Sequence, residues 1–119
     1  MRELTLDVDR GGDVVVARLD GEVDSSNASE LRLALARRVP SEARALTVDL
    51  SGVTYLDSSG VELLFELGRS LAARRQTISL VVPKAAPVRR VLELSSVESV
   101  APIHADLDDA LAAVAGPSA

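Results

Sequence analysis

Hydrophobic and polar positions alternate at the start of the chain, where apolar residues stand at positions 4, 6 and 8 with polar residues between them. A period of two is typical of a strand that buries one face. Gly11-Gly12 follows and predicts a tight turn. A second strand is predicted from Val14 to Leu19, where β-branched residues are more frequent. The two strands are expected to pair as an antiparallel hairpin.

Residues 20–24 are predicted to connect this hairpin to a helix, because Asn27 with Glu30 three residues later resembles a capping box. Pro40 and Ser41 end that helix. Beyond it, short apolar segments alternate with segments of helical period. The further elements predicted in this way are a buried strand over 46–50, an amphipathic helix after it, a strand over 77–82 ended by Pro83, a short helix opened by Pro87 with Val88, Val91 and Leu92 facing inward, an edge segment over 100–103, and a last helix from Leu107 that Gly116-Pro117 ends.

The helix after residues 46–50 carries apolar residues on one stripe, at steps of three and four. We expect this stripe to face the sheet, with Glu62, Glu66 and Arg69 on the other face. A glycine within the stripe lowers helix stability, which predicts close packing against a neighbour. The stripe consists of Val61, Leu64, Phe65, Gly68, Leu71 and Ala72.

A hairpin followed by alternating helices and strands predicts an α/β fold with a single mixed β-sheet and about four helices packed on it. The length of 119 residues predicts one domain, and a hydrophobic content of 47% excludes a disordered chain. The hairpin also argues against a doubly wound fold of the response-regulator kind, which places a helix directly after its first strand.

Charge and composition limit the partners that we expect. The net charge is −5 at pH 7, so acids prevail over Lys and Arg, and we expect no direct nucleic-acid partner. An acidic surface instead favours a partner with a basic patch. Three arginine pairs, Arg37-Arg38, Arg74-Arg75 and Arg89-Arg90, are interpreted as solvated faces and helix C-terminal charges.

The chain has no cysteine, which excludes disulfides and thiolate metal sites. No apolar run approaches the roughly 18 residues that cross a bilayer, and the N-terminus alternates and carries acids, unlike a signal peptide. We therefore expect no membrane partner and a cytoplasmic location.

The most informative segment is Leu56-Asp57-Ser58-Ser59-Gly60, where a strand gives way to the amphipathic helix. A hydroxyl is thereby placed at a helix N-terminus, where unpaired N–H groups and the helix dipole receive a phosphate well. This position suits a reversibly phosphorylated serine, although the serine could also be an N-cap and nothing more.

The spacing from Ser59 to Glu62 fits a capping box. If Ser59 is the cap, Ser58 lies just outside the helix and its hydroxyl is free for a partner. A shift of one residue would exchange the two roles. Two acids accompany the serines: Asp57 precedes Ser58, and Asp24 ends the turn 21–24. Because loops at one end of an α/β sheet converge, these acids are expected to be neighbours.

An enzyme would need more chemistry than the chain offers. A serine nucleophile requires a base, and the sole histidine, His104, is interpreted as a surface residue. The nucleophile-elbow pattern is absent, because Leu56 occupies its first glycine position. Asp106, Asp108 and Asp109 are interpreted as an acidic helix start rather than a metal site. We expect no catalytic residues, no cofactor and no metal.

Two segments carry a resemblance to a known family. The turn Gly21-Glu22-Val23-Asp24 and residues 48–60, Val-Asp-Leu-Ser-Gly-Val-Thr-Tyr-Leu-Asp-Ser-Ser-Gly, resemble the STAS-domain anti-sigma factor antagonists of bacteria. The resemblance spans nearly the whole chain, including the late helix over 88–94. It implies a STAS-like fold, a single STAS domain over 1–119, and a binding protein that is not an enzyme.

Members of this family bind an anti-sigma factor that is also a serine kinase, and so free the sigma factor. The resemblance implies that the kinase phosphorylates the first serine of the motif, here Ser58, and that a phosphatase reverses this. Phosphorylation is expected to release the partner. The partner-binding residues expected on these grounds are Glu22, Asp24, Asp57, Ser58, Ser59, Gly60 and Glu62.

Two departures from the family pattern are present. Gly60-Val61-Glu62 stands where the family often has Gly-Leu-Gly, so an acid beside the acceptor is expected to slow phosphorylation. Leu94-Ser95-Ser96-Val97 stands where a Ser-Gly-Leu step is common, a milder change. The alternative is a constitutive STAS interaction subunit of a signalling or transport assembly, in which the serine is only a cap.

Overall fold

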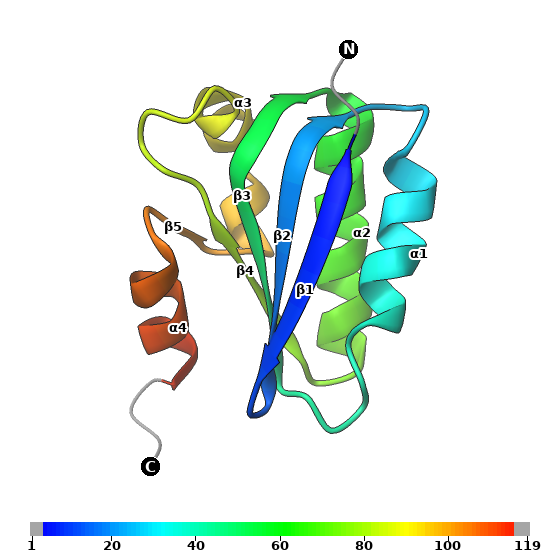
Figure 1. Cartoon of the computed structure of the whole chain (residues 1–119), viewed down its shortest axis with the longest axis vertical. Coiled ribbons are helices and arrows are strands. Elements are labelled where there is room, and N and C mark those ends of the chain that lie inside the picture. Colours follow the sequence, from blue (N-terminus) through cyan, green and yellow to red (C-terminus); the bar gives the residue numbers. More distant parts are fainter. Residues whose placement is uncertain (1–3, 116–119) are drawn as a thin grey trace.

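The computed structural model describes residues 4–115 (Figure 1). The strands are β1 (Thr5–Gly11), β2 (Val14–Val23), β3 (Ala45–Leu56), β4 (Thr77–Val81) and β5 (Ile103–His104). The helices are α1 (Ala28–Arg37), α2 (Ser58–Ala73), α3 (Arg89–Ser95) and α4 (Leu107–Ala115), with a short 3-10 helix, η1 (Val97–Ser99), after α3.

The strands form one sheet in the order β1-β2-β3-β4-β5. β1 and β2 are antiparallel, and each later neighbouring pair is parallel. Within residues 4–115 the predicted α/β class, the mixed sheet with its N-terminal hairpin and the four α-helices are therefore confirmed.

The helices form layers on both faces of the sheet. Helices α1 and α2 lie side by side on one face, and α4 packs against β3, β4 and β5 on the other (Figure 1). The core beneath α1 and α2 is aliphatic, with Leu35, Leu46 and Leu64 almost fully buried. On the α4 side, the buried Thr47 and Ser79 hydroxyls lie 3.0 Å apart and satisfy one another.

Strands β2 and β3 run further than their sequence predicts. The segment 20–24 was expected to be a connection and β3 to end near residue 50, but β2 continues to Val23 and β3 to Leu56. Ser51-Gly52 resembles a turn in the sequence. Pairing with β2 holds it extended, with register shifts along the pair, and a Cβ on Gly52 would lie 3.0 Å from Cγ of Asp20.

The buried face of α2 is rotated from the predicted stripe. Leu64, Gly68 and Leu71 are buried as expected, whereas Val61 and Phe65 are only half-buried and Ala72 is exposed. Two leucines outside the predicted stripe, Leu63 and Leu67, are buried instead. The helix has apolar positions on more than one face, so a periodicity of 3.6 does not by itself identify the face that meets the sheet.

Smaller differences lie near the C-terminus. Val88 and Leu92 are buried as predicted, but Val91 is exposed. The predicted edge segment is realised as β5, a little later than expected. A Cβ on Gly68 would lie 3.2 Å from the Cβ of Val100, which confirms the close packing predicted there. The predicted helix end at Gly116-Pro117 lies outside the described residues.

Candidate functional site

The pairing of β2 with β3 brings the two predicted acids to one end of the sheet. Val23 pairs with Leu56, and the N–H of Asp57 donates to the carbonyl of Val23 at 3.3 Å. Asp24 and Asp57 therefore follow paired residues at the carboxyl ends of neighbouring strands. The expectation that their loops converge is confirmed.

Asp57 caps helix α2. Its carboxylate accepts hydrogen bonds from the N–H of Ser59 at 2.9 Å and the N–H of Gly60 at 3.3 Å. The helix begins at Ser58, so Ser58 is its first residue rather than the residue outside it.

The prediction that Ser59 is the cap, with Glu62 closing a capping box, is therefore wrong. Aspartate and serine are comparable caps, so the local sequence allowed either register. Pairing with β2 keeps the chain extended through Leu56, which makes Asp57 the first residue able to turn into the helix. Glu62 is exposed on the first turns of α2 and has no part in the cap.

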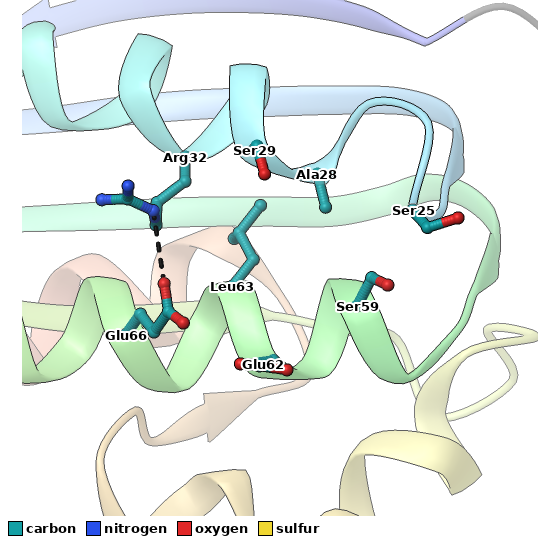
Figure 2. Close-up of a pocket in the computed structure, with 8 residues that line it drawn as sticks. All are labelled: Ser25, Ala28, Ser29, Arg32, Ser59, Glu62, Leu63 and Glu66. Atoms are coloured by element: carbon teal, nitrogen blue, oxygen red, sulfur yellow. Dashed lines mark ion pairs between the residues drawn. The ribbon is translucent and has the colours of Figure 1, made fainter.

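The two serines of the motif differ in exposure. Neither hydroxyl makes a hydrogen bond among residues 4–115, but Ser58 is exposed and Ser59 is half-buried. Ser59 lines a cleft of about 190 Å³ between α1 and α2. Figure 2 shows Ser59 and Ser25 where these helices begin and, further along the cleft, the Arg32–Glu66 ion pair at 3.3 Å.

Ser58 lines a second depression, which we call the α2–α3 groove, of about 630 Å³. Exposure of its hydroxyl and its position at the start of α2 make Ser58 the accessible serine of the pair. The groove is lined by residues of both helices: Ser58, Val61, Glu62, Phe65 and Arg69 of α2, and Val91, Leu94 and Ser95 of α3.

The end of β2, with Glu22, and the loop after it, with Asp24, are held by hydrogen bonds to the Asn27 side chain. The Asn27 side chain donates to the carbonyl of Glu22 at 2.9 Å and accepts from the N–H of Asp24 at 3.0 Å. Asn27 does occupy the N-cap position of α1, but it makes no side-chain cap bond. The predicted capping box with Glu30 is therefore wrong, because the Asn27 side chain is used by the preceding loop.

Ser26 acts on the Asp24 carboxylate. The hydroxyl of Ser26 and, with a smaller effect, its N–H donate to the Asp24 carboxylate, and both bonds hold the pKa of that carboxyl below its usual value. Because the pKa of Asp24 is lower in the folded than in the unfolded protein, these bonds contribute their full stability at pH values above the pKa of the unfolded state. The contribution is lost as the pH falls through the pKa of the folded state. At neutral pH Asp24 therefore adds an ordered negative charge beside Asp57.

Gly60 allows the start of α2 to lie close to the strand ends. A Cβ on Gly60 would lie 2.7 Å from Cγ of Leu56 and 3.2 Å from Cγ1 of Val23. Contacts under 3.0 Å require a neighbour to move, so a larger residue would displace the first turn of α2. Gly60 is thus a packing residue that sets the position of the two serines.

The chemistry around Ser58 is limited to carboxylates and hydroxyls. His104 lies half-buried in β5, and no hydrogen bond joins it to Ser58 within the described part of the chain. Asp106 accepts from the N–H of Asp109 at 2.8 Å, in keeping with the predicted acidic start of α4. Across residues 4–115, no three His, Asp or Glu side chains are grouped so as to hold a metal ion.

None of the helices between residues 4 and 115 combines the length and apolar character that crossing a membrane requires.

Comparison with known proteins places this arrangement in a family. The model of the STAS domain matches residues 5–110. The anti-sigma-F factor antagonist RsfB of Mycobacterium tuberculosis is 29% identical over 114 residues, which cover 95% of this chain and 91% of RsfB. The crystal structure of an anti-sigma factor antagonist from Mycobacterium paratuberculosis superposes with a TM-score of 0.84 at 31% identity, over 95% of each chain.

A more distant structure shares the fold. The anti-sigma factor antagonist SpoIIAA in its unphosphorylated form superposes with a TM-score of 0.70 at 21% identity, over 94% of this chain and 99% of SpoIIAA. SpoIIAA of Bacillus in its phosphorylated form gives a TM-score of 0.65. The chain therefore belongs to the STAS domain family, among the anti-sigma factor antagonists.

Proposed function

We propose that this protein is a phosphorylation-switched antagonist of an anti-sigma factor that is itself a serine kinase. Unphosphorylated, it binds the anti-sigma factor and frees the sigma factor; phosphorylated on Ser58, it releases the anti-sigma factor. A phosphatase restores the binding form. The partner-facing surface surrounds Ser58 and includes Glu22, Asp24, Asp57, Ser59 and Glu62, while Gly60, also expected there, is buried beneath it and acts by positioning the serines.

The exposure of the Ser58 hydroxyl carries this proposal. A kinase must reach the acceptor oxygen, and Ser58 stands exposed at the first position of α2. Asp57 has the capping role, so a covalent change at Ser58 removes no cap from the helix. The acceptor can therefore be modified without loss of a structural hydrogen bond among the described residues.

The surroundings of Ser58 favour release by charge rather than by refolding. A phosphate adds about −1.5 to −2 charges at pH 7. The N–H groups of Ser59 and Gly60 already donate to Asp57, so these two are not the unpaired phosphate-binding groups that the sequence led us to expect, and they do not neutralise the phosphate. A partner covering this surface would have to desolvate a dianion beside a carboxylate, and like charges at an interface cost several kcal/mol.

The relatives support the same reading. RsfB is named an anti-sigma-F factor antagonist, and SpoIIAA has been solved in phosphorylated and unphosphorylated forms. By extension we propose that this chain is a single STAS domain over 1–119 that works in the cytoplasm as a regulator of transcription. It acts as a binding protein, not an enzyme, and contacts neither nucleic acid nor membrane directly.

A constitutive STAS subunit is the second candidate. It would use the same surface to hold a signalling or transport assembly together, with no phosphate on Ser58. This candidate and the switch differ in one measurable property, which is phosphorylation.

The test is a kinase assay. Incubated with the co-encoded anti-sigma kinase and MgATP, the protein should gain one phosphate, mapped by mass spectrometry to Ser58. Ser58→Ala should abolish this gain and largely retain binding to the kinase, because the Ser58 hydroxyl makes no hydrogen bond to any of residues 4–115.

Ser59→Ala is the matched control, since it removes a neighbouring hydroxyl and should leave phosphorylation intact. A phosphate mapped to Ser59 would contradict the assignment of the acceptor. Binding without phosphorylation by any co-encoded kinase would favour the constitutive subunit.

A further inference from the structure

Helix α2 carries a second apolar face that the sheet does not cover. Val61 and Phe65 are half-buried and line the α2–α3 groove. On the opposite wall, Val91 is 41% exposed and Leu94 is 73% exposed. A leucine exposed to this degree beside other apolar side chains, in a groove of about 630 Å³, marks a surface suited to burial by a partner.

The two ends of the groove differ in chemistry. Ser58 lies at one end and Arg69 at the other, with the apolar side chains between them. Arg69 lies eleven positions after Ser58 on the helix, which corresponds to about 16 Å, or three turns. Arg69 is exposed and forms no ion pair among residues 4–115. The groove therefore presents a neutral hydroxyl with the Glu62 carboxylate one turn further along α2, an apolar patch, and the Arg69 cation at the far end.

We propose that the α2–α3 groove anchors an amphipathic helix of the anti-sigma factor, an inference that rests on the proposed function. Such a helix presents apolar side chains at positions i, i+3, i+4 and i+7, which span about two turns. These side chains can pack on the apolar patch that α2 and α3 form with one helical turn each. Its acidic side chain would lie over Arg69, which supplies charge complementarity and fixes the direction of the helix. Continuity with Ser58 places this helix against the surface that the kinase must reach.

The groove also explains how one phosphate can block binding. A partner helix seated on Val61 and Leu94 removes water from the adjacent Ser58. A neutral hydroxyl tolerates this at small cost, whereas an unpaired dianion in the same place does not. The surface that supplies the affinity thereby senses the phosphorylation state directly, with no change in the fold.

The first experiment compares two exposed leucines. The dissociation constant of the full-length, co-encoded anti-sigma factor is measured for unphosphorylated wild type, for Leu94→Asp and for Leu33→Asp. Leu33 is a matched control, because it is 44% exposed on α1, outside the groove. We expect Leu94→Asp to weaken binding at least about tenfold and Leu33→Asp to leave it within about twofold.

The second experiment locates the contact directly. Because the chain has no cysteine, Leu94→Cys and Leu33→Cys each carry one thiol. Saturating anti-sigma factor should slow alkylation at position 94 at least about tenfold and leave position 33 unchanged, since a buried thiol is inaccessible to reagent. Thermal unfolding of both variants checks that they are folded.

The outcomes separate this inference from the proposed function. If wild type binds the anti-sigma factor, but neither affinity nor alkylation at position 94 responds, the groove is not the anchor and the proposed function stands. If wild type forms a dimer that Leu94→Asp dissociates, the groove belongs to self-association and the inference is wrong. Failure of wild type to bind any anti-sigma factor overturns the proposed function and this inference together.

Discussion

Asp57 relieves both neighbouring serines of the capping role. Its carboxylate satisfies the N–H groups of Ser59 and Gly60, which would otherwise seek a side-chain oxygen. The serines then differ in what surrounds them: Ser58 borders the α2–α3 groove, and Ser59 borders the cleft toward α1. At the residue scale, accessibility and not hydrogen bonding distinguishes the two hydroxyls.

This arrangement predicts which single changes destabilise the domain. Asp57→Ala should lower the free energy of unfolding by about 0.5–2 kcal/mol, the usual loss for an N-cap. Ser59→Ala should change it by less than about 0.5 kcal/mol, as for a substitution without a structural role. Urea denaturation of the three proteins measures both effects. A larger loss for Ser59→Ala than for Asp57→Ala would mean that the cap lies one residue later.

At the scale of elements, α2 has two apolar faces with different tasks. Leu63, Leu64, Leu67 and Leu71 are buried where the helix packs on the sheet and on α1. Val61 and Phe65 lie on the side toward α3 and only partly join the core. The first set determines stability, and the second remains available for the proposed partner.

Leu67 tests this division, because it is buried in the structure but absent from the stripe read from the sequence. Leu67→Ala should lower the free energy of unfolding by about 2–5 kcal/mol, and Leu64→Ala by a similar amount, through loss of core volume. Ala72→Ser changes an exposed position on the same helix and should have an effect below about 0.5 kcal/mol. A small effect of Leu67→Ala in chemical denaturation would show that the helix is rotated toward the predicted stripe.

At the scale of the whole molecule, acids lie where α1 and α2 begin and arginine pairs lie where these two helices end. Because β2 and β3 are parallel, α1 and α2 both begin at the same end of the sheet (Figure 1). Asp24 and Asp57 precede these two helices, and Glu62 lies in the first turns of α2. Both helices end at the opposite pole, which carries Arg37-Arg38 and Arg74-Arg75, and Arg74 donates to the carbonyl of Val39 at 3.1 Å. The arginine pairs at these helix ends oppose the helix dipoles, as their interpretation from the sequence expected.

The acidic end should oppose the addition of a phosphate. At saturating anti-sigma kinase, Glu62→Gln should raise the single-turnover rate of phosphorylation, most clearly at low salt, because it removes one like charge near the acceptor. Thermal stability should stay nearly unchanged, since Glu62 is not part of the cap. Glu42→Gln makes the same change between α1 and β3, at the opposite pole, and should leave the rate unaltered. Equal rates for Glu62→Gln and wild type at low ionic strength would show that Glu62 does not influence the acceptor.

The hydrophobic periodicity and the turn residues of the sequence were sufficient to predict most of the strands and helices of this protein. The alternation before Gly11-Gly12 predicts the hairpin, and the apolar segment 46–50 followed by Asp57-Ser58 predicts a strand that leads into a helix. Both follow from backbone geometry, since side chains repeat every two residues in a strand and every 3.6 in a helix. The fold class and the position of Ser58 near a helix start therefore could be read from the sequence.

Tertiary packing decided the lengths of β2 and β3, the cap of α2 and the buried face of α2, because each of these depends on residues that are distant in the sequence. Pairing between β2 and β3 carried both strands beyond their turn signals and made Asp57, not Ser59, the cap. Contact with the sheet and with α1 selected which of several apolar faces of α2 is buried. Asp57 and Ser59 are nearly equal as helix caps in local free energy, and so are the alternative apolar faces of α2. Burial and strand pairing, which join residues far apart in the sequence, therefore determine which cap and which face are used.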